Sequence, residues 1–307
     1  NTLYIGGTSL YRSTDGFTST ANTEWIGGYK CTPNDPKDYV YDGHHPDQHS
    51  VHFDPSDPSR MYSTHDGGIS VTTAPLATPV VWTPIKATYT TTEFYTVNVE
   101  EGGATSPHLI GGTQDNGTWL AMDDDPNNNW HYVHQDDGAY AAIPEGRAFY
   151  LTSSQSGRLY KKLVNASGTV LAYERIDPIN GTNSYNFINQ FVLDPGNNNR
   201  VYWVSASKIW RNNDLLGIPY TDNFYDRIAT NCEQINGAAL PTSQRITTLD
   251  ISAADDQTLF YASIQGKVYR CDSLDTNPVK TEITGADMPA AYTSCVAPND
   301  LDPDEWL

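Results

Sequence analysis

Positive charge is scarce in this chain of 307 residues, which holds 18 Lys and Arg against 37 Asp and Glu and has a formal net charge of −19. Nucleic-acid binding needs a basic surface that neutralises phosphates, so the balance argues against that function. An anionic membrane surface would repel the chain for the same reason. No stretch approaches the roughly 18 consecutive apolar residues of a membrane-spanning helix, which argues against insertion.

Apolar residues (38%) and charged residues (18%) both fall below typical globular usage of about 45–50% and about 25%. Uncharged polar residues, chiefly Thr, Ser, Asn, Gly and Tyr, take their place. This composition favours short strands joined by turns over helices. The 7 Trp, 20 Tyr and 8 Phe residues supply enough apolar surface for a folded core, which excludes a disordered chain.

Cysteine is also scarce, with four residues at positions 31, 232, 271 and 295. Four cysteines allow three pairings, and the short separation favours Cys271 with Cys295. The alternative is that all four are buried thiols, because free cysteine packs well in cores.

The chain begins at Asn1 without an initiator Met, a basic region or an apolar leader. We therefore expect a processed product or a segment of a longer multidomain chain. Asn-x-Ser/Thr sequons begin at Asn116, Asn165 and Asn180 and are compatible with secretion. Since the acidic balance keeps a secreted chain soluble, we expect an extracellular or cell-surface location.

One pattern recurs along the whole chain. A short apolar strand ends in a turn, a polar loop follows, and a strand with Tyr or Phe comes next, as in His52–Pro55 with Arg60–Ser63 and in Val192–Pro195 with Arg200–Trp203. The turns fall at positions 54, 98, 143, 194, 250 and 297, in steps of 44, 45, 51, 56 and 47 residues. This spacing is typical of the four-stranded blades of a β-propeller.

A second motif follows in phase, in which an apolar residue, an aromatic residue and a base are consecutive. Its copies end at Arg12, Lys161, Arg211 and Arg270. Each copy follows the Tyr/Phe strand after a short turn, so the two strands form a hairpin with the aromatic residue and the base on opposite faces.

These repeats predict an all-β fold, a single β-propeller of about six four-stranded blades over residues 1–307, with blades that bury their faces against one another. The C-terminal strand could close the ring on the N-terminal blade. Alternatively, both ends are cut from a longer chain that contains other domains.

Three segments have the sequence of an Asp-box, Ser/Thr-x-Asp-x-Gly-x-Thr-Trp, in whole or in part: Ser13–Ser19, Thr64–Ser70 and Thr113–Trp119. Their aspartates are Asp15, Asp66 and Asp115. An aspartate in such a turn accepts backbone N–H groups, and the glycine adopts a positive φ. We therefore expect a structural role for these boxes.

With these boxes, and with Asp47–His49, Phe53–Pro55 and Gly111–Gly117, the chain resembles the Asp-box (BNR-repeat) propeller superfamily, most closely its secreted bacterial surface propellers. That superfamily includes sialidases, xyloglucan-cleaving glycosidases and the sortilin ectodomain. The resemblance implies the fold more than the function, because propellers host many activities. The Arg-Ile-Pro motif of sialidases is missing, since no Pro follows Arg175-Ile176, Arg227-Ile228 or Arg245-Ile246.

Two segments are candidate metal sites. His45, Asp47 and His49 alternate, so on a strand they would share one face and could bind Zn²⁺ with an open position. Alternatively, they line a central funnel and bond to neighbouring blades. The second segment is an acidic loop whose oxygen ligands suit Ca²⁺, or which is a solvated turn. Its candidate ligands are Asp123, Asp124 and Asp125.

Glycoside hydrolysis needs two facing carboxylates. The candidates expected to face the funnel are Asp47, Asp115, Asp136 and Asp137. A ligand could also be bound without catalysis, by amide and aromatic side chains. These candidates are Gln114, Asn116, Trp119, Trp130 and Tyr140. We expect a non-enzymatic module that binds a glycan or a protein, with a glycoside hydrolase and a structural spacer in a large adhesin as the alternatives.

Overall fold

The computed structural model describes residues 2–32, 35–85, 92–125, 127–179, 184–302 and 304–305. The chain divides into two compact units, residues 1–91 (unit 1) and 92–307 (unit 2), which are described separately. The single propeller over the whole chain stays a prediction. In the part of the chain that the structure describes, no helix has the length and apolar character needed to cross a membrane.

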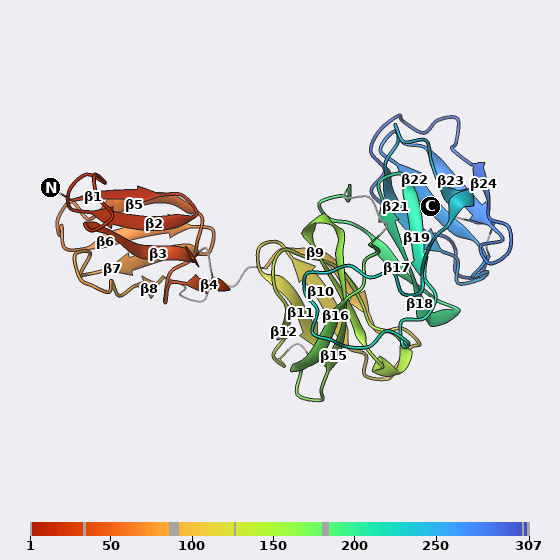
Figure 1. The fold of residues 1–307 in the computed structure, drawn as a ribbon, viewed down its shortest axis with the longest axis horizontal. Helices are drawn as coiled ribbons and strands as arrows, with labels where there is room; N and C mark the ends of the chain where they lie inside the picture. Colours follow the sequence, from red (N-terminus) through yellow and green to blue (C-terminus); the bar gives the residue numbers. More distant parts are fainter. Residues whose placement is uncertain are drawn as a thin grey trace. The chain divides into compact units, whose positions relative to one another are not determined.

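The described residues form six antiparallel sheets of four strands, and the strands of each sheet pair in chain order (Figure 1). Unit 1 holds sheets I and II. Sheet I contains β1 (Leu3–Gly6), β2 (Ser9–Ser13), β3 (Thr23–Thr32) and β4 (Asp35–Val40). Sheet II contains β5 (Gln48–Phe53), β6 (Met61–His65), β7 (Gly68–Thr72) and β8 (Thr83–Pro84).

Unit 2 holds sheets III to VI. Sheet III contains β9 (Phe94–Val99), β10 (Leu109–Thr113), β11 (Gly117–Ala121) and β12 (His131–His134). Sheet IV contains β13 (Gly138–Ala142), β14 (Tyr150–Ser154), β15 (Arg158–Val164) and β16 (Val170–Arg175). Sheet V contains β17 (Phe191–Asp194), β18 (Asn197–Ser205), β19 (Lys208–Asn212) and β20 (Cys232–Gln234). Sheet VI contains β21 (Ile246–Ile251), β22 (Leu259–Ser263), β23 (Val268–Asp272) and β24 (Val279–Glu282). Three single-turn 3-10 helices complete the described elements: η1 (Glu145–Arg147), η2 (Gln155–Gly157) and η3 (Asn236–Ala238).

The prediction of an all-β fold of six four-stranded propeller blades is confirmed. Five of the six predicted turns lie at or beside the end of a first strand, namely β5, β9, β13, β17 and β21. The sixth, at Ala297, lies in a C-terminal segment outside the named strands. Sheet I begins with β1, which pairs with β2 as the Tyr-strand hairpin expected there.

The second and third strands of sheets II to VI pair in the same register, and in sheet I the first two strands, β1 and β2, pair in this way. The pairs that define it are Leu3 with Ser13, Met61 with Thr72, Leu109 with Ala121, Tyr150 with Lys162, Val201 with Asn212 and Leu259 with Cys271. The residue that comes just before the second-named member of each pair, such as Arg12 before Ser13, therefore occupies the same position in all six sheets. It is the base of the predicted motif in sheets I, IV, V and VI.

Three of these bases join their sheet to a loop of the next. The buried Arg12 of sheet I donates from Nη1 to the carbonyl oxygens of Pro75 (2.6 Å) and Ala77 (3.1 Å), in the β7–β8 loop of sheet II. The buried Lys161 of sheet IV donates from Nζ to the carbonyl of Leu215 (2.9 Å), in the β19–β20 loop of sheet V. The position thus fastens successive sheets together.

Sheet V repeats the arrangement, whereas the base of sheet VI contacts its own sheet and the C-terminal segment. Arg211 donates from Nη1 to Asp275 Oδ1 at 2.5 Å, in the β23–β24 loop of sheet VI. Arg270 pairs with Asp272 in its own sheet and with Asp304 in the C-terminal segment. Sheets II and III have Val71 and Leu120 instead of a base.

The apolar cores lie between consecutive sheets, as stacked blades require. The core of unit 1 contains Leu10, Ile26, Met61, Val80 and Trp82. In unit 2, one cluster joins sheets III and IV, one joins IV and V, and one joins V and VI.

The predicted Cys271–Cys295 disulfide is wrong. Both thiols are free, and so is Cys232. Cys271 is buried in the core between sheets V and VI, whereas Cys295 is exposed in the C-terminal segment. The side chain of Cys31 lies outside the described residues.

We expect Arg12→Met to destabilise unit 1 by about 3 kcal/mol, because the substitution leaves Glu24 and two loop carbonyls without their cation. Urea unfolding, followed by amide exchange in β6 and β7, measures the effect. Arg60→Met is the control, since Arg60 is exposed, and it should change stability by less than about 0.5 kcal/mol. Equal effects of the two substitutions would show that the base is not a fastening point.

Candidate functional site

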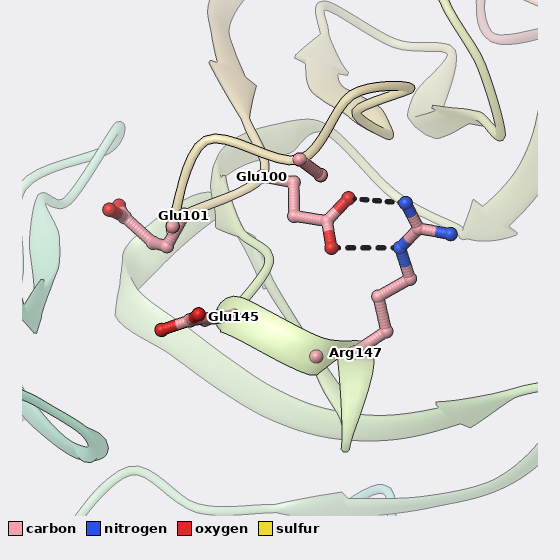
Figure 2. Close-up of a pocket in the computed structure, with 7 residues that line it drawn as sticks. Glu100, Glu101, Glu145 and Arg147 are labelled. Atoms are coloured by element: carbon pink, nitrogen blue, oxygen red, sulfur yellow. Dashed lines mark hydrogen bonds and ion pairs between the residues drawn. The ribbon is translucent and has the colours of Figure 1, made fainter.

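A pocket of about 420 Å³ opens where the β9–β10 loop meets η1, at the border of sheets III and IV (Figure 2). Its lining residues are Glu100, Glu101, Gly102, Ala104, Glu145, Gly146 and Arg147. Two chain segments that are about 45 residues apart in sequence, one repeat of the propeller pattern, therefore build one site.

An ion pair fixes one wall of the pocket. The Glu100 side chain is 3% exposed and receives Arg147 Nε at 2.8 Å and Nη2 at 2.7 Å (Figure 2). The backbone N–H of His108 donates to the same carboxylate at 3.1 Å. Burial alone would raise the pKa of Glu100, but the hydrogen bonds from Arg147 and His108 hold that pKa below its ordinary value.

The remaining carboxylates of the pocket, Glu101 and Glu145, have no hydrogen bond or ion pair among the described residues. Figure 2 shows both directed to the same side, away from the Glu100–Arg147 pair. The wall that carries them is held through the main chain, because Glu101 N donates to Ile143 O (3.0 Å) and Glu145 N to Asn198 Oδ1 (2.7 Å). The pocket therefore combines a rigid neutral pair with two acidic groups.

Glu101 also belongs to a second acidic group. Partial burial and the Asp300 carboxyl raise the pKa of Glu101. Burial, together with Asp300 and Glu101, raises the pKa of Asp250 to about 6, although the Ile251 N–H acts in the opposite direction. Sequence reasoning used Asp250 only as a marker of the repeat, because nothing in the sequence tells that this residue of β21 becomes half-buried near other carboxyls.

Three of the predicted catalytic aspartates do lie close together, at the opposite ends of the strands of sheets III and IV. Asp115 N donates to Asp137 Oδ1 (2.8 Å), and Asp137 N donates to Gln155 Oε1 (3.2 Å). Arg158 Nη1 lies 3.2 Å from Asp136 Oδ2. Asp47, the fourth candidate, belongs to unit 1 and is described apart from them.

The β10–β11 turn gathers three of the predicted ligand-binding residues. Trp119 Nε1 donates to Asn116 O (2.7 Å), and Asn116 Nδ2 donates to Gln114 O (2.9 Å). The Trp119 ring meets the edge of Tyr132, whose residue is 52% exposed, with 5.2 Å between centroids. Amide groups and aromatic rings are therefore adjacent here.

The other two predicted ligand-binding residues lie elsewhere in unit 2. Trp130 packs on Phe94, with 5.5 Å between ring centroids. The pKa of Tyr140 is raised by burial and then by Cys295, Tyr292 and Asp250, which places this ring near the C-terminal segment.

The predicted zinc site of His45, Asp47 and His49 is not formed. Strand β5 begins only at Gln48, and Asp47 has a φ of 61°, so the three residues do not alternate along one strand. His45 Nδ1 lies 3.0 Å from Pro46 O, and His49 Nε2 lies 2.5 Å from Asp66 Oδ1. Among the described residues, no three His, Cys, Asp or Glu side chains could hold a metal ion.

The predicted calcium loop is likewise not a metal group in the described part of the chain. Asp123 Oδ1 accepts Asp125 N (3.0 Å), and Asp123 Oδ2 accepts Asn128 Nδ2 (2.7 Å). The Asn127 backbone and side-chain N–H groups lower the pKa of Asp125, and Asp124 is exposed. The loop is closed by its own hydrogen bonds, as an Asx turn is.

The three Asp-box aspartates occupy two different positions in their sheets. Asp15 lies in the β2–β3 loop and accepts Ser13 Oγ (2.8 Å), Thr18 N (3.2 Å) and Ser19 Oγ (2.7 Å), and these bonds lower its pKa. By the shared register, β2 is equivalent to β7 and β11, so Asp15 follows this strand, whereas Asp66 and Asp115 lie in the turns that precede it. The motif therefore does not mark one repeated place.

No protein family matches the chain. No curated protein matches it either. Among solved structures, a chain of the crystal structure of the mitotic checkpoint complex matches with a TM-score of 0.45 and 9% identity, over 98% of this chain and 78% of that chain. At this identity and TM-score, the likeness assigns neither a family nor a function.

We expect acid to destabilise unit 1, because burial lowers the pKa of His44 to about 3 and that of His65 to about 4. The unfolded chain takes up protons below about pH 6.5 that the folded unit rejects, so stability is lost as pH falls from about 6.5 towards 4. The loss should be at least about 1 kcal/mol per pH unit.

Amide exchange in β6 and β7 at pH 7 and pH 5 measures this loss. His44→Phe should reduce the loss, since neither ring nitrogen of His44 has a hydrogen-bond partner and the ring packs on Trp82 at 4.5 Å. His52→Gln, at an exposed histidine, should behave as the unmodified chain does. An equal acid response in all three proteins would contradict the assignment to His44.

We expect Arg147→Met to destabilise unit 2 by about 3 kcal/mol, because it leaves the buried Glu100 carboxylate unpaired. The same change should raise the pKa of Glu100, so part of the lost stability should return in acid. Urea unfolding at pH 7 and pH 4.5 measures both effects. Loss of stability that is the same at both pH values would contradict the ion-pair explanation.

Proposed function

We propose that this chain is a binding module that holds a cationic side chain, lysine or arginine, of a partner protein in the Glu100–Arg147 pocket. Propeller blades supply a binding or scaffold module in general, and the pocket gives this one a defined site. The observation that carries the proposal is the pair of acidic groups, Glu101 and Glu145, beside a fixed ion pair in a cavity of about 420 Å³.

Charge supports this choice of ligand. The Glu100 carboxylate is already neutralised by Arg147, so the charge left in the pocket is negative and comes from Glu101 and Glu145. The net charge of −19 would draw a basic partner towards the chain and increase its rate of association. The acidic balance and the sequons support an extracellular or cell-surface setting as part of the proposal.

A glycan is the second candidate ligand, and a separate observation favours it. At the β10–β11 turn, the exposed Gln114 and Asn116 adjoin the Trp119–Tyr132 ring pair. Such rings can cover a sugar face while amides form hydrogen bonds with its hydroxyls.

Glycoside hydrolysis is supported by Asp250, whose raised pKa suits a general acid. The adhesin spacer and calcium stabilisation stay predictions.

The proposal predicts that lysine-rich or arginine-rich peptides bind the chain and that acidic peptides of equal length do not. Isothermal titration at low and at physiological salt measures the affinities, which should fall with salt because the contact is electrostatic. The double substitution Glu101→Gln and Glu145→Gln should lower the affinity about tenfold, since each exposed carboxylate contributes about 0.5–1 kcal/mol.

Glu93→Gln is the matched control, because it removes an exposed carboxylate that lies just before β9 and outside the pocket. It should leave the affinity nearly unchanged. Equal losses in control and double variant would show that only net charge matters and would refute the pocket. Binding on a glycan array without peptide binding would favour the second candidate, and polysaccharide turnover that Asp250→Asn abolishes would favour hydrolysis.

A further inference from the structure

The contact between sheets III and IV, called here the III–IV seam, contains two buried bases that come from facing sheets. His134 at the end of β12 is 2% exposed, and Lys162 in β15 is 6% exposed. Lys162 Nζ donates to the carbonyl of Val133 at 2.6 Å, so the amine of sheet IV reaches the strand that carries His134. The two basic groups are neighbours within one seam.

Neither base has a carboxylate in ion-pair contact among the described residues. Both ring nitrogens of His134 lack a hydrogen-bond partner, and its ring packs on Tyr160 with 4.6 Å between centroids. Asp136, the carboxylate that acts electrostatically on Lys162, is paired with Arg158. The charged and titratable groups around the two bases are Asp136, Arg158, Tyr150, Tyr160 and Tyr173.

A proton on either base would therefore create a buried charge without an ionic partner, which is costly in a protein interior. Burial lowers the pKa of Lys162 to about 7, against the partial opposition of Asp136. Burial, followed by Lys162 and Arg158, lowers the pKa of His134 well below its ordinary value. Both groups prefer to be uncharged in the closed seam.

We propose that the III–IV seam is a proton-operated switch, closed while His134 and Lys162 are uncharged and loosened when either takes up a proton. The sign follows from linkage. An open seam returns Lys162 to water, where it binds a proton up to about pH 10.4, so opening is favoured as pH falls from that value to about 7. His134 extends the same trend below about pH 6.5.

The switch is connected to the pocket. Tyr150 is the cross-strand partner of Lys162, and its hydroxyl lies 3.0 Å from His108 Nδ1. The backbone N–H of His108 in turn donates to Glu100. The seam and the pocket wall are thus joined by one cross-strand pair and two hydrogen bonds, but the switch itself does not depend on what the pocket binds.

Amide exchange of the full chain between pH 7 and pH 9, corrected for intrinsic exchange rates, tests the switch. The open fraction reported by β12 and β14 should rise about tenfold for each pH unit of acidification, because one proton is taken up. Amides of β21 and β22 in sheet VI are the internal reference. A seam whose open fraction does not change over this range would overturn the proposal.

Lys162→Met should abolish the trend between pH 9 and pH 7. Lys267→Met is its matched control, since Lys267 is a half-exposed lysine paired with Glu282, and it should preserve the trend. An identical slope in Lys162→Met and the unmodified chain would refute the role of Lys162. Should Lys162→Met fail to fold, an NMR titration of the lysine amines in the unmodified chain decides. An Nζ midpoint near 7 supports the switch, and a midpoint above 10 for Lys162 rejects it.

Discussion

A small sheet that is apolar on both faces cannot bury them alone, and this requirement organises the whole chain. Four core clusters are shared by consecutive sheets, and the base of the repeated motif adds a hydrogen-bonded contact from one sheet to a loop of the next in three places. The base is absent in sheets II and III, which have Val71 and Leu120 at this position.

The seams of unit 2 differ in chemistry although their topology repeats. Between sheets IV and V, the core includes Leu151, Leu159 and Trp203. The Lys161 amine does not disturb this packing, because loop carbonyls accept its hydrogen bonds. Between sheets III and IV, His134 and Lys162 lie inside the contact itself. Apolar packing stabilises the contact between sheets IV and V, whereas the two buried bases lower the stability of the III–IV seam and make it depend on pH.

The fold was largely predictable from the sequence, because it depends on properties that recur. Turn spacing, the hairpin motif and the low helix content all indicate the same repeated blade. A wrong interpretation of one copy of the repeat therefore does not change the predicted fold, because the other copies still indicate it. Individual sites have no such redundancy. Asp47 illustrates this, since one positive φ removed the alternation on which the zinc prediction depended.

The important groups of the site were missed for a related reason. Glu100, His134 and Lys162 belong to no motif, and their properties arise from burial and from neighbours that are distant in sequence. Sequence periodicity can show which face of a strand is buried, but it cannot show which two faces meet. The way in which sheet IV packs on sheet III decides that a lysine, and not an apolar residue, reaches Val133.

A fall in pH affects the pocket in two ways, and both lower its affinity for a cationic ligand. Acidification neutralises Glu101 earlier than an ordinary carboxyl, because partial burial and Asp300 raise its pKa. Acidification also charges the bases of the III–IV seam, which weakens the support of the Glu100 wall through Tyr150 and His108. One effect removes the negative charge that attracts the ligand, and the other loosens the wall that shapes the cavity. A module built in this way would hold a basic partner near neutral pH and release it in acid, without any change in the fold of the remaining sheets.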